Sequence, residues 1–271
     1  MTLTEYKVIQ QFLSQSCGIV LSESKQYLAT NRLTGLLKKF DLDSFSELVT
    51  AINTNSSSSV RVKAAVVDAM TTNETFWFRD DAQFLELKAK IFPEIFSRKP
   101  ATIKVWSAAC SSGQEPYTIS MCVEDAGKKM GQSPSVQIIG TDISESILQE
   151  AKAAVYSDLA LSRGLDIQTK GRFFQKTHDG YKLSSTVANR VRFQPFNLLK
   201  PFSVLGRFDV IFCRNVLIYF SDEVKRDILS RMVDLLEPGG YLFLSSTESM
   251  PVTVKNIEPI RGRVRYFKKL P

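Results

Sequence analysis

In the first seventy residues, apolar side chains recur at intervals of three and four, the spacing of one face of an α-helix. The first set comprises Val8, Ile9, Phe12 and Leu13. Similar sets predict further helices over residues 24–40, 44–52 and 60–70. The serine-rich stretch 53–59 is typical of a loop. Since no strand pattern interrupts the helices, we expect a small all-helical N-terminal domain over residues 1–72.

After Pro100 the pattern changes to strand-like apolar runs that alternate with helical segments. The runs cover residues 103–109, 136–140, 191–196, 208–213 and 241–244. This alternation predicts an α/β domain over residues 100–271, with a mostly parallel sheet and helices on both faces. It lapses over about 160–190, where the turn sequence His178-Asp-Gly predicts a small antiparallel β insertion. Residues 73–99 form the linker and a helix that joins the domains.

The 271 residues contain no apolar run of membrane-spanning length, and the N-terminus lacks the pattern of a signal peptide. We therefore expect a cytoplasmic protein without direct membrane insertion. Four cysteines form no CxxC pair, which predicts free, mostly buried thiols. The single histidine, His178, lies in a turn, so neither a zinc site nor a histidine-dependent triad is expected. The chemistry should need no histidine and no metal.

The net charge of +7 is unevenly distributed. Residues 1–85 carry 8 Lys and Arg against 9 Asp and Glu, so the rest of the chain carries 27 against 19. Six of those cations lie between Lys255 and Lys269, where they alternate with apolar residues as on an exposed strand. A solvated sheet edge explains this tail as well as a phosphate track does, and no nucleic-acid partner is expected.

The first predicted strand runs into the loop Cys110-Ser-Ser-Gly-Gln-Glu-Pro-Tyr117. In an open parallel sheet the ligand lies beyond the carboxyl ends of the strands, where the strand order reverses. Gly113 lets a ligand approach the backbone closely, but a single glycine does not match the glycine-rich dinucleotide fingerprint. Glu115 would repel a pyrophosphate and attract a cation, such as the amino group or sulfonium of S-adenosylmethionine.

Polar residues also follow the other predicted strands. Asp142, at the end of the second strand, can accept both hydroxyls of a ribose, and the alternative is an N-cap for the next helix. Asn197, after the third strand, is a candidate for hydrogen bonds to an adenine edge. Arg214, Asn215 and Tyr219 interrupt the apolar run after the fourth strand, and such polar insertions are costly unless they are paired or functional.

The segment Thr71-Thr-Asn-Glu-Thr-Phe-Trp-Phe-Arg79 joins the two predicted domains. It sets three consecutive aromatic residues beside the polar side chains of Asn73, Thr75 and Arg79. Two interpretations stay open. The segment is either a hinge packed by aromatic rings and capped by Thr or Asn, or part of the wall of a ligand site.

Together these motifs resemble those of the chemotaxis receptor methyltransferases of the CheR type. The resemblance rests on Thr72–Arg79, Trp106–Tyr117, Thr141-Asp142, Asn197–Leu199 and Phe212–Phe220. The stretch Leu236-Glu-Pro-Gly-Gly-Tyr-Leu242 resembles a pattern shared more widely among methyltransferases of this fold. The match covers nearly the whole chain. It implies a class I, Rossmann-like methyltransferase domain, and transfer of a methyl group from S-adenosylmethionine to glutamate side chains of chemoreceptors. The products would be glutamate methyl esters and S-adenosylhomocysteine.

The resemblance also implies roles for individual residues. The implied cofactor-binding residues are Asn73, Thr75, Arg79, Glu115, Asp142, Asn197, Leu198, Arg214 and Asn215. Arg79 and Tyr219 match family positions linked to catalysis. A glutamate side chain, with a pKa of about 4.3, is already an anionic nucleophile at neutral pH and needs no general base. Catalysis should then be mostly proximity and orientation, with Arg79 holding or ordering the substrate carboxylate and Tyr219 aligning it.

Lys25, Arg32 and Lys39 lie seven residues apart, so they form one stripe on the second predicted helix, with Lys38 beside it. A charged stripe is ordinarily a solvated face. In the family, however, the N-terminal domain is thought to meet the acidic helices of the receptor, so the resemblance favours a docking surface. The expected partner is the cytoplasmic helical domain of chemoreceptors, which would recruit the enzyme, as a monomer, to membrane-bound receptor arrays.

In some family members the inserted hairpin binds a short peptide at the C-terminus of the receptor. The turn over residues 177–180 is short by comparison, so we expect no such tether. Three other functions stay open: a methyltransferase of the same fold acting on RNA or another protein, a non-catalytic module that binds the cofactor product, and a nicotinamide oxidoreductase. The single-glycine loop disfavours the last of these.

Overall fold

The computed structural model describes residues 1–98, 100–262 and 264–271. Lys99, at the predicted start of the α/β domain, and Arg263, in the basic tail, lie outside the described residues. Among the described residues, no helix combines the length and the apolar character needed to cross a bilayer.

The N-terminal domain is all-helical, as predicted. Its helices are α1 (Leu3–Cys17), α2 (Gln26–Lys39), α3 (Phe45–Asn53) and α4 (Ser57–Met70), with a 3₁₀ turn η1 (Glu23–Lys25) before α2. Their apolar faces meet in a core of fully buried side chains, among them Tyr6, Leu13, Leu33, Leu48 and Val66. Each buried face comes from the three-and-four spacing of apolar residues, which is why the helices are readable from the chain alone.

The loop predicted over the serine-rich residues 53–59 is only partly correct, because α4 already begins at Ser57. The Ser56 hydroxyl accepts a hydrogen bond from the backbone N–H of Ser59, and the Ser59 hydroxyl accepts one from the backbone N–H of Ser56. This capping box satisfies amide groups that the first helical turn leaves free. Serines that indicated a loop by composition therefore start a helix.

The linker leads into three short helical segments that continue one another. They are α5 (Asp81–Glu86), a π-helical turn η2 (Leu87–Ile91) and α6 (Phe92–Ser97). Phe84, Leu87, Phe92 and Phe96 are buried among the strands and helices of the α/β body, so this joining helix belongs structurally to that body.

A seven-stranded sheet forms the centre of the α/β body. Its strands are β1 (Ile103–Ala108), β2 (Val136–Asp142), β6 (Val191–Pro195), β7 (Phe208–Cys213), β8 (Leu236–Phe243), β9 (Ile257–Ile260) and β10 (Tyr266–Lys269). The order is β6-β2-β1-β7-β8-β10-β9. Among the described residues of this sheet, the pairings of β10 are antiparallel and the others are parallel. The chain extends from β1 to β2 and β6 on one side and returns to β7 on the other, so the strand order reverses beside β1.

Alternate residues of the central strands pack into two different cores. Val105 of β1 contacts one cluster, which includes α5, α6 and the long helix α7 (Gln114–Met130). The neighbouring Trp106 contacts the other cluster, which includes the 3₁₀ turn η3 (Phe202–Leu205) and α12 (Asp222–Leu235). The sheet is therefore covered on both faces, as the alternation of strands and helices predicted.

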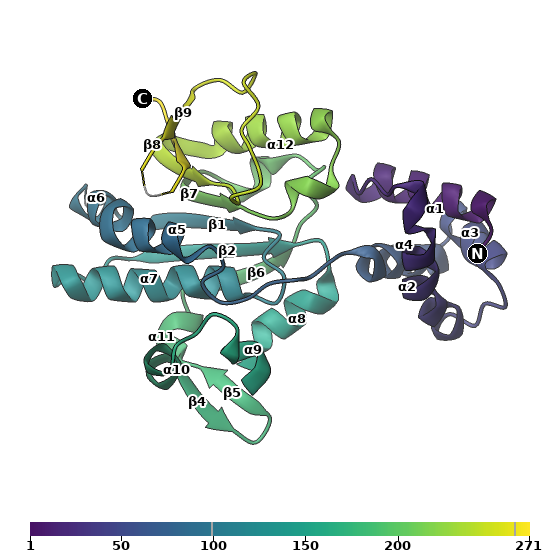
Figure 1. The fold of residues 1–271 in the computed structure, drawn as a ribbon, viewed down its shortest axis with the longest axis horizontal. Helices are drawn as coiled ribbons and strands as arrows, with labels where there is room; N and C mark the ends of the chain where they lie inside the picture. The colour runs from purple at the N-terminus through teal and green to yellow at the C-terminus, as the bar shows by residue number, and fades with distance from the viewer. Residues whose placement is uncertain (99, 263) are drawn as a thin grey trace.

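The insertion forms a separate small sheet beside the α/β body (Figure 1). Its strands are β3 (Val155–Tyr156), β4 (Phe174–Thr177) and β5 (Gly180–Leu183), in the antiparallel order β3-β5-β4. Helices α8 (Glu145–Ala153), α9 (Asp158–Ser162), α10 (Ile167–Phe173) and α11 (Ser185–Ala188) flank these strands. The predicted hairpin is present, whereas the two-residue strand β3 was too short to predict.

Candidate cofactor site

A pocket lies at the reversal of strand order, between the carboxyl ends of the central strands and the helical domain. Its empty volume is about 1020 Å³, open mouth included. Its walls come from the end of α1, the linker, the loops after β1, β2, β6 and β7, and the 3₁₀ turn η4 (Leu217–Tyr219). Every residue predicted to bind the cofactor or to catalyse lines it: Asn73, Thr75, Arg79, Glu115, Asp142, Asn197, Leu198, Arg214, Asn215 and Tyr219.

The loop after β1 holds a strained backbone against the pocket. Ala109 and Ser111 have positive φ angles of 55° and 50°, and Gly113 has 92°. A Cβ at Gly113 would lie 3.1 Å from atoms of Ala151, Phe193 and Tyr117, so both the conformation and the space require glycine. Backbone strain of this kind persists where surrounding contacts over-determine it, and it clusters at ligand sites.

The carboxylate of Asp142 is buried at the end of β2. One of its oxygens accepts the N–H of Ser111 at 2.9 Å, and the other accepts the N–H of Ser144 at 3.0 Å. Burial raises the pKa of Asp142 above its ordinary value, although these N–H groups partly oppose the effect. Ser144, not Asp142, is the N-cap of α8, so the capping alternative is wrong. Each oxygen keeps a lone pair that a ribose hydroxyl can use.

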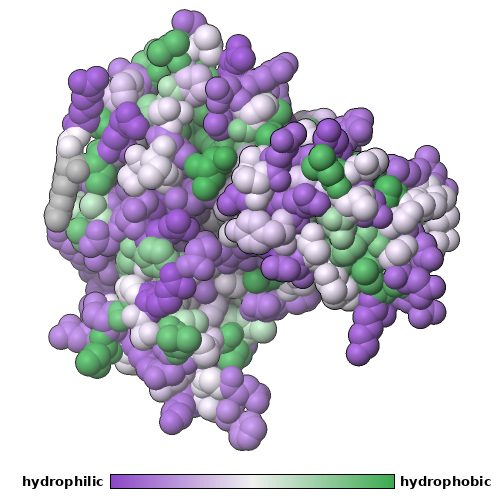
Figure 2. All heavy atoms as spheres, turned by 45° about the vertical axis from the view of Figure 1, so that its right-hand side comes forward, coloured by the Kyte–Doolittle hydropathy of each residue, from purple (hydrophilic) through white to green (hydrophobic). Residues whose placement is uncertain are grey.

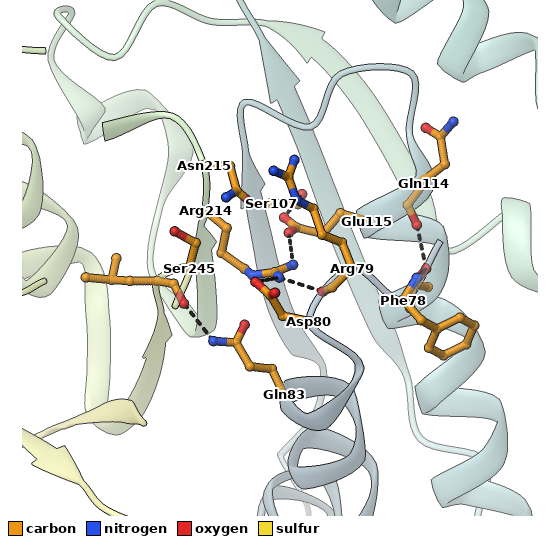
Figure 3. A network of polar contacts seen from close by, with 12 residues as sticks. Phe78, Arg79, Asp80, Gln83, Ser107, Gln114, Glu115, Arg214, Asn215 and Ser245 are labelled. Atoms are coloured by element: carbon orange, nitrogen blue, oxygen red, sulfur yellow. Dashed lines mark hydrogen bonds and ion pairs between the residues drawn. The ribbon is translucent and has the colours of Figure 1, made fainter. Parts of the chain in front are cut away.

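Arg214 forms a buried ion cluster with two carboxylates (Figure 3). Its side chain is 1 % exposed and pairs with Glu115 at 2.9 Å and Asp80 at 2.7 Å. It also donates to the backbone carbonyl of Arg79 at 2.5 Å, while Ser107 donates to Glu115 at 2.7 Å. The sequence did not predict these partners of Glu115. The cluster of two carboxylates and one guanidinium still carries a net charge of −1, which suits a cationic ligand.

The linker segment has a pocket-lining part and a packed aromatic part. The carbonyl of Asn73 accepts the Ser111 hydroxyl at 2.8 Å, which ties the pocket-lining part of the linker to the loop after β1. Trp77, by contrast, is fully buried and packs against the rings of Tyr156 and Phe174. Arg79 donates to the carbonyl of Glu74 at 3.1 Å, and its guanidinium points away from Arg214 in Figure 3.

Asn197 lines the pocket, but its side chain already has protein partners. Its amide nitrogen donates to the carbonyl of Ser16 at 2.7 Å, and its oxygen accepts the N–H of Leu199 at 3.0 Å. Ser16 lies in the last turn of α1, where carbonyl groups lack helical partners. These bonds hold the N-terminal domain to the loop after β6. They leave one N–H and one lone pair of the Asn197 amide, and the adenine hydrogen bonds of this side chain stay a prediction.

Two further contacts between the domains frame the pocket. The carbonyl of Tyr219 accepts the N–H of Val20 at 2.9 Å. Asp68 of α4 accepts hydrogen bonds from the hydroxyls of Ser144 and Ser146 at the start of α8. Asp68 was missed from the sequence, because an exposed-looking carboxylate in an amphipathic helix carries no sign of a partner far along the chain.

The four predicted docking cations differ in their surroundings. Lys25, Lys38 and Lys39 are exposed. Arg32 instead donates to the carbonyls of Met70 and Thr71 at 3.0 and 2.9 Å. Arg32 therefore caps the end of α4, directly before the pocket-lining linker. The docking stripe stays a prediction, and Arg32 has a structural function within it.

The fold and the pocket at its topological switch point, with one acidic residue after β1 and another at the end of β2, define a class I methyltransferase that uses S-adenosylmethionine. Two family models match the chain: "CheR methyltransferase, SAM binding domain" over residues 73–266, and "CheR methyltransferase, all-alpha domain" over residues 4–71. The chain belongs to the CheR methyltransferase family, and it acts as a methyltransferase of chemotaxis.

Curated relatives agree along nearly the whole length. A chemotaxis protein methyltransferase of Vibrio anguillarum is 47% identical over 268 residues, covering 98% of this chain and 96% of the relative. Chemotaxis protein methyltransferase 1 of Pseudomonas aeruginosa is 45% identical, covering 91% and 90%. The chemotaxis protein methyltransferase of Salmonella typhimurium is 35% identical, covering 96% and 88%.

Proposed function

We propose that the chain methylates glutamate side chains of chemoreceptors, giving glutamate methyl esters. The observation that carries this proposal is the absence of a placed general base among the described residues of the pocket. Glu115 is paired with Arg214 and Glu74 with Arg163, and both oxygens of Asp142 accept backbone N–H groups. Burial raises the pKa of the Cys110 thiol well above its ordinary value. A substrate that is already an anion, such as a carboxylate, suits this site best.

The lining of the pocket suits the cofactor in charge and polarity, because buried carboxylates lie beside apolar side chains. S-adenosylmethionine, when bound, supplies an electrophilic methyl group on a positively charged sulfur. Asp142 would receive the ribose hydroxyls, and the net negative cluster around Arg214 would favour the cationic part. Ile143, Phe196 and Leu198 add apolar surface for the base.

Arg79 and Tyr219 line the same pocket as the cofactor-binding residues. Arg79 is held through its carbonyl by Arg214 and through its side chain by the Glu74 carbonyl, which leaves other N–H groups free for a carboxylate. Such a prearranged guanidinium can orient the substrate without a tight ion pair that would weaken the nucleophile. Tyr219 adds a hydroxyl that would align the substrate carboxylate by a hydrogen bond. Catalysis would then come from proximity and orientation.

Two measurements test this proposal. Peptides of a chemoreceptor methylated by the enzyme in vitro, sequenced by mass spectrometry, should carry the new methyl groups on glutamate side chains. Methyl groups on lysine, arginine or the protein termini would contradict it. In parallel, Arg79→Ala should lower turnover by about a hundredfold while the Kd for S-adenosylhomocysteine changes by less than about fivefold. Turnover near that of the wild type would remove Arg79 from catalysis.

Docking would use the exposed cations Lys25, Lys38 and Lys39 against acidic receptor helices, and would recruit the enzyme to receptor arrays. On the face drawn in Figure 2, hydrophilic side chains predominate and hydrophobic ones form small separate groups. A polar contact fits the face drawn there better than a large apolar interface. The two-residue turn between β4 and β5 keeps the hairpin short, and the absence of a peptide tether stays a prediction.

A further inference from the structure

The turn after α9 in the insertion lies directly against the linker. The backbone N–H of Trp77 donates to the carbonyl of Arg163 at 3.2 Å. Gly164 has a φ of +95°, and a Cβ there would lie 1.9 Å from the carbonyl oxygen of Trp77. Only glycine allows this approach, so the backbone of the insertion is locked onto the segment that carries Arg79.

Side chains of the insertion extend this contact toward the pocket. The fully buried ring of Trp77 meets Tyr156 and Phe174 edge to face, with ring centres 4.9 and 5.2 Å apart. The hydroxyl of Tyr156 donates to the carbonyl of Ser112 at 2.8 Å, in the loop after β1. The insertion therefore contacts both the linker wall and the β1-loop wall of the cofactor pocket.

Arg163 and Arg79 share the same two neighbours. The guanidinium of Arg163 lies 5.2 Å from the centre of the Phe76 ring, and that of Arg79 lies 5.4 Å from the same ring. Arg163 forms an ion pair with the Glu74 carboxylate, while Arg79 donates to the Glu74 carbonyl. Glu74 and Phe76 thus each contact both an arginine of the insertion and the arginine expected to orient the substrate.

We propose that Arg163 is a positioning residue for methyl transfer, which acts on Arg79 through Phe76 and Glu74. This inference rests on the proposed catalytic role of Arg79. The side chains of Arg163 and Glu74 are 49% and 56% exposed, so their ion pair contributes little to stability. Its effect is geometric: it fixes one side of Phe76, and the fixed ring limits the orientations of Arg79. Displacement of an orienting group by about 1 Å can lower the rate by up to about a hundredfold.

The test compares Arg163→Ala with a matched arginine of the same insertion. Among the described residues, Arg172 pairs with Asp125 of α7 and contacts the Phe173 ring rather than the linker, and its side chain is 42% exposed. With receptor-containing membranes as substrate, Arg163→Ala should lower kcat by about tenfold and change the Kd for S-adenosylhomocysteine by less than about twofold. Arg163→Lys, which keeps the charge, should restore most of kcat. Arg172→Ala should keep the kcat of the wild type.

The combination with Arg79→Ala shows whether Arg163 acts through Arg79. If it does, adding Arg163→Ala to Arg79→Ala causes no further loss, because the two substitutions remove one function. A kcat of Arg163→Ala within about twofold of the wild type, or an equal loss in Arg172→Ala, would overturn the positioning role. Full turnover of Arg79→Ala alone would instead overturn the catalytic role on which the inference rests, so the two failures are distinguishable.

Discussion

Substitution of Arg214 by Met removes the cation of the buried cluster while keeping a side chain of similar length. The guanidinium is 1% exposed and makes two ion pairs and one backbone hydrogen bond. Glu115, whose side chain is 14% exposed, would lose its counter-ion inside the pocket wall. Asp80, whose side chain is 35% exposed, could be hydrated instead, so its loss of a partner costs less. Removal of one partner of a buried pair costs about 3–5 kcal/mol. Because Ser107 still donates to Glu115, we expect a loss of about 3 kcal/mol in the free energy of unfolding.

Urea denaturation of the cofactor-free protein measures this loss as a lower midpoint with an unchanged slope. The double variant Arg214→Met/Glu115→Gln should recover at least about half of it, because an amide needs no counter-ion. Arg172→Met, which breaks an exposed pair, is the control and should cost less than about 1 kcal/mol. A loss below about 1 kcal/mol in Arg214→Met, or no recovery in the double variant, would refute the view that Glu115 depends on Arg214.

Three further predictions concern the ligand sites and the thiols. Affinity for S-adenosylhomocysteine, measured by calorimetry, should fall as the pH drops through the raised pKa of Asp142, because the ionised carboxylate accepts the ribose hydroxyls. Asp142→Asn should bind more weakly than the wild type, with an affinity that does not depend on pH over that range. The double variant Lys38→Glu/Lys39→Glu should raise the apparent KM for receptor at least about threefold and leave the affinity for cofactor unchanged. Arg32→Glu should weaken the binding of both receptor and cofactor, because the hydrogen bonds of Arg32 hold the end of α4. An unchanged KM in the double variant would mean that the two lysines are solvated and do not contact the receptor. The four cysteines are buried, and burial raises the pKa of Cys122 to about 12. A thiol reagent at pH 8 should therefore modify the cysteines only slowly until urea is added. Rapid modification of the native protein would contradict this prediction.

The elements that the sequence predicted are those with a local pattern. The helices of the N-terminal domain and the five parallel strands were readable because each buries a face that repeats within a few residues. The pocket residues were readable because carboxyl ends of parallel strands converge at one edge. Pairings between distant positions were not readable. The bond from Asn197 to Ser16 and the ion pair of Arg214 with Asp80 depend on how the two domains and the linker meet, and no local spacing records this.

The proposed receptor-glutamate chemistry is tested most directly by the alkaline lability of the transferred methyl group. Receptor-containing membranes would be incubated with the enzyme and methyl-labelled S-adenosylmethionine, washed, and treated with base, and the volatile label would be counted. We predict that most of the label leaves as methanol, since carboxyl methyl esters are hydrolysed by base. Label that stays on the protein, or that is found on RNA, would contradict methyl ester formation on glutamate.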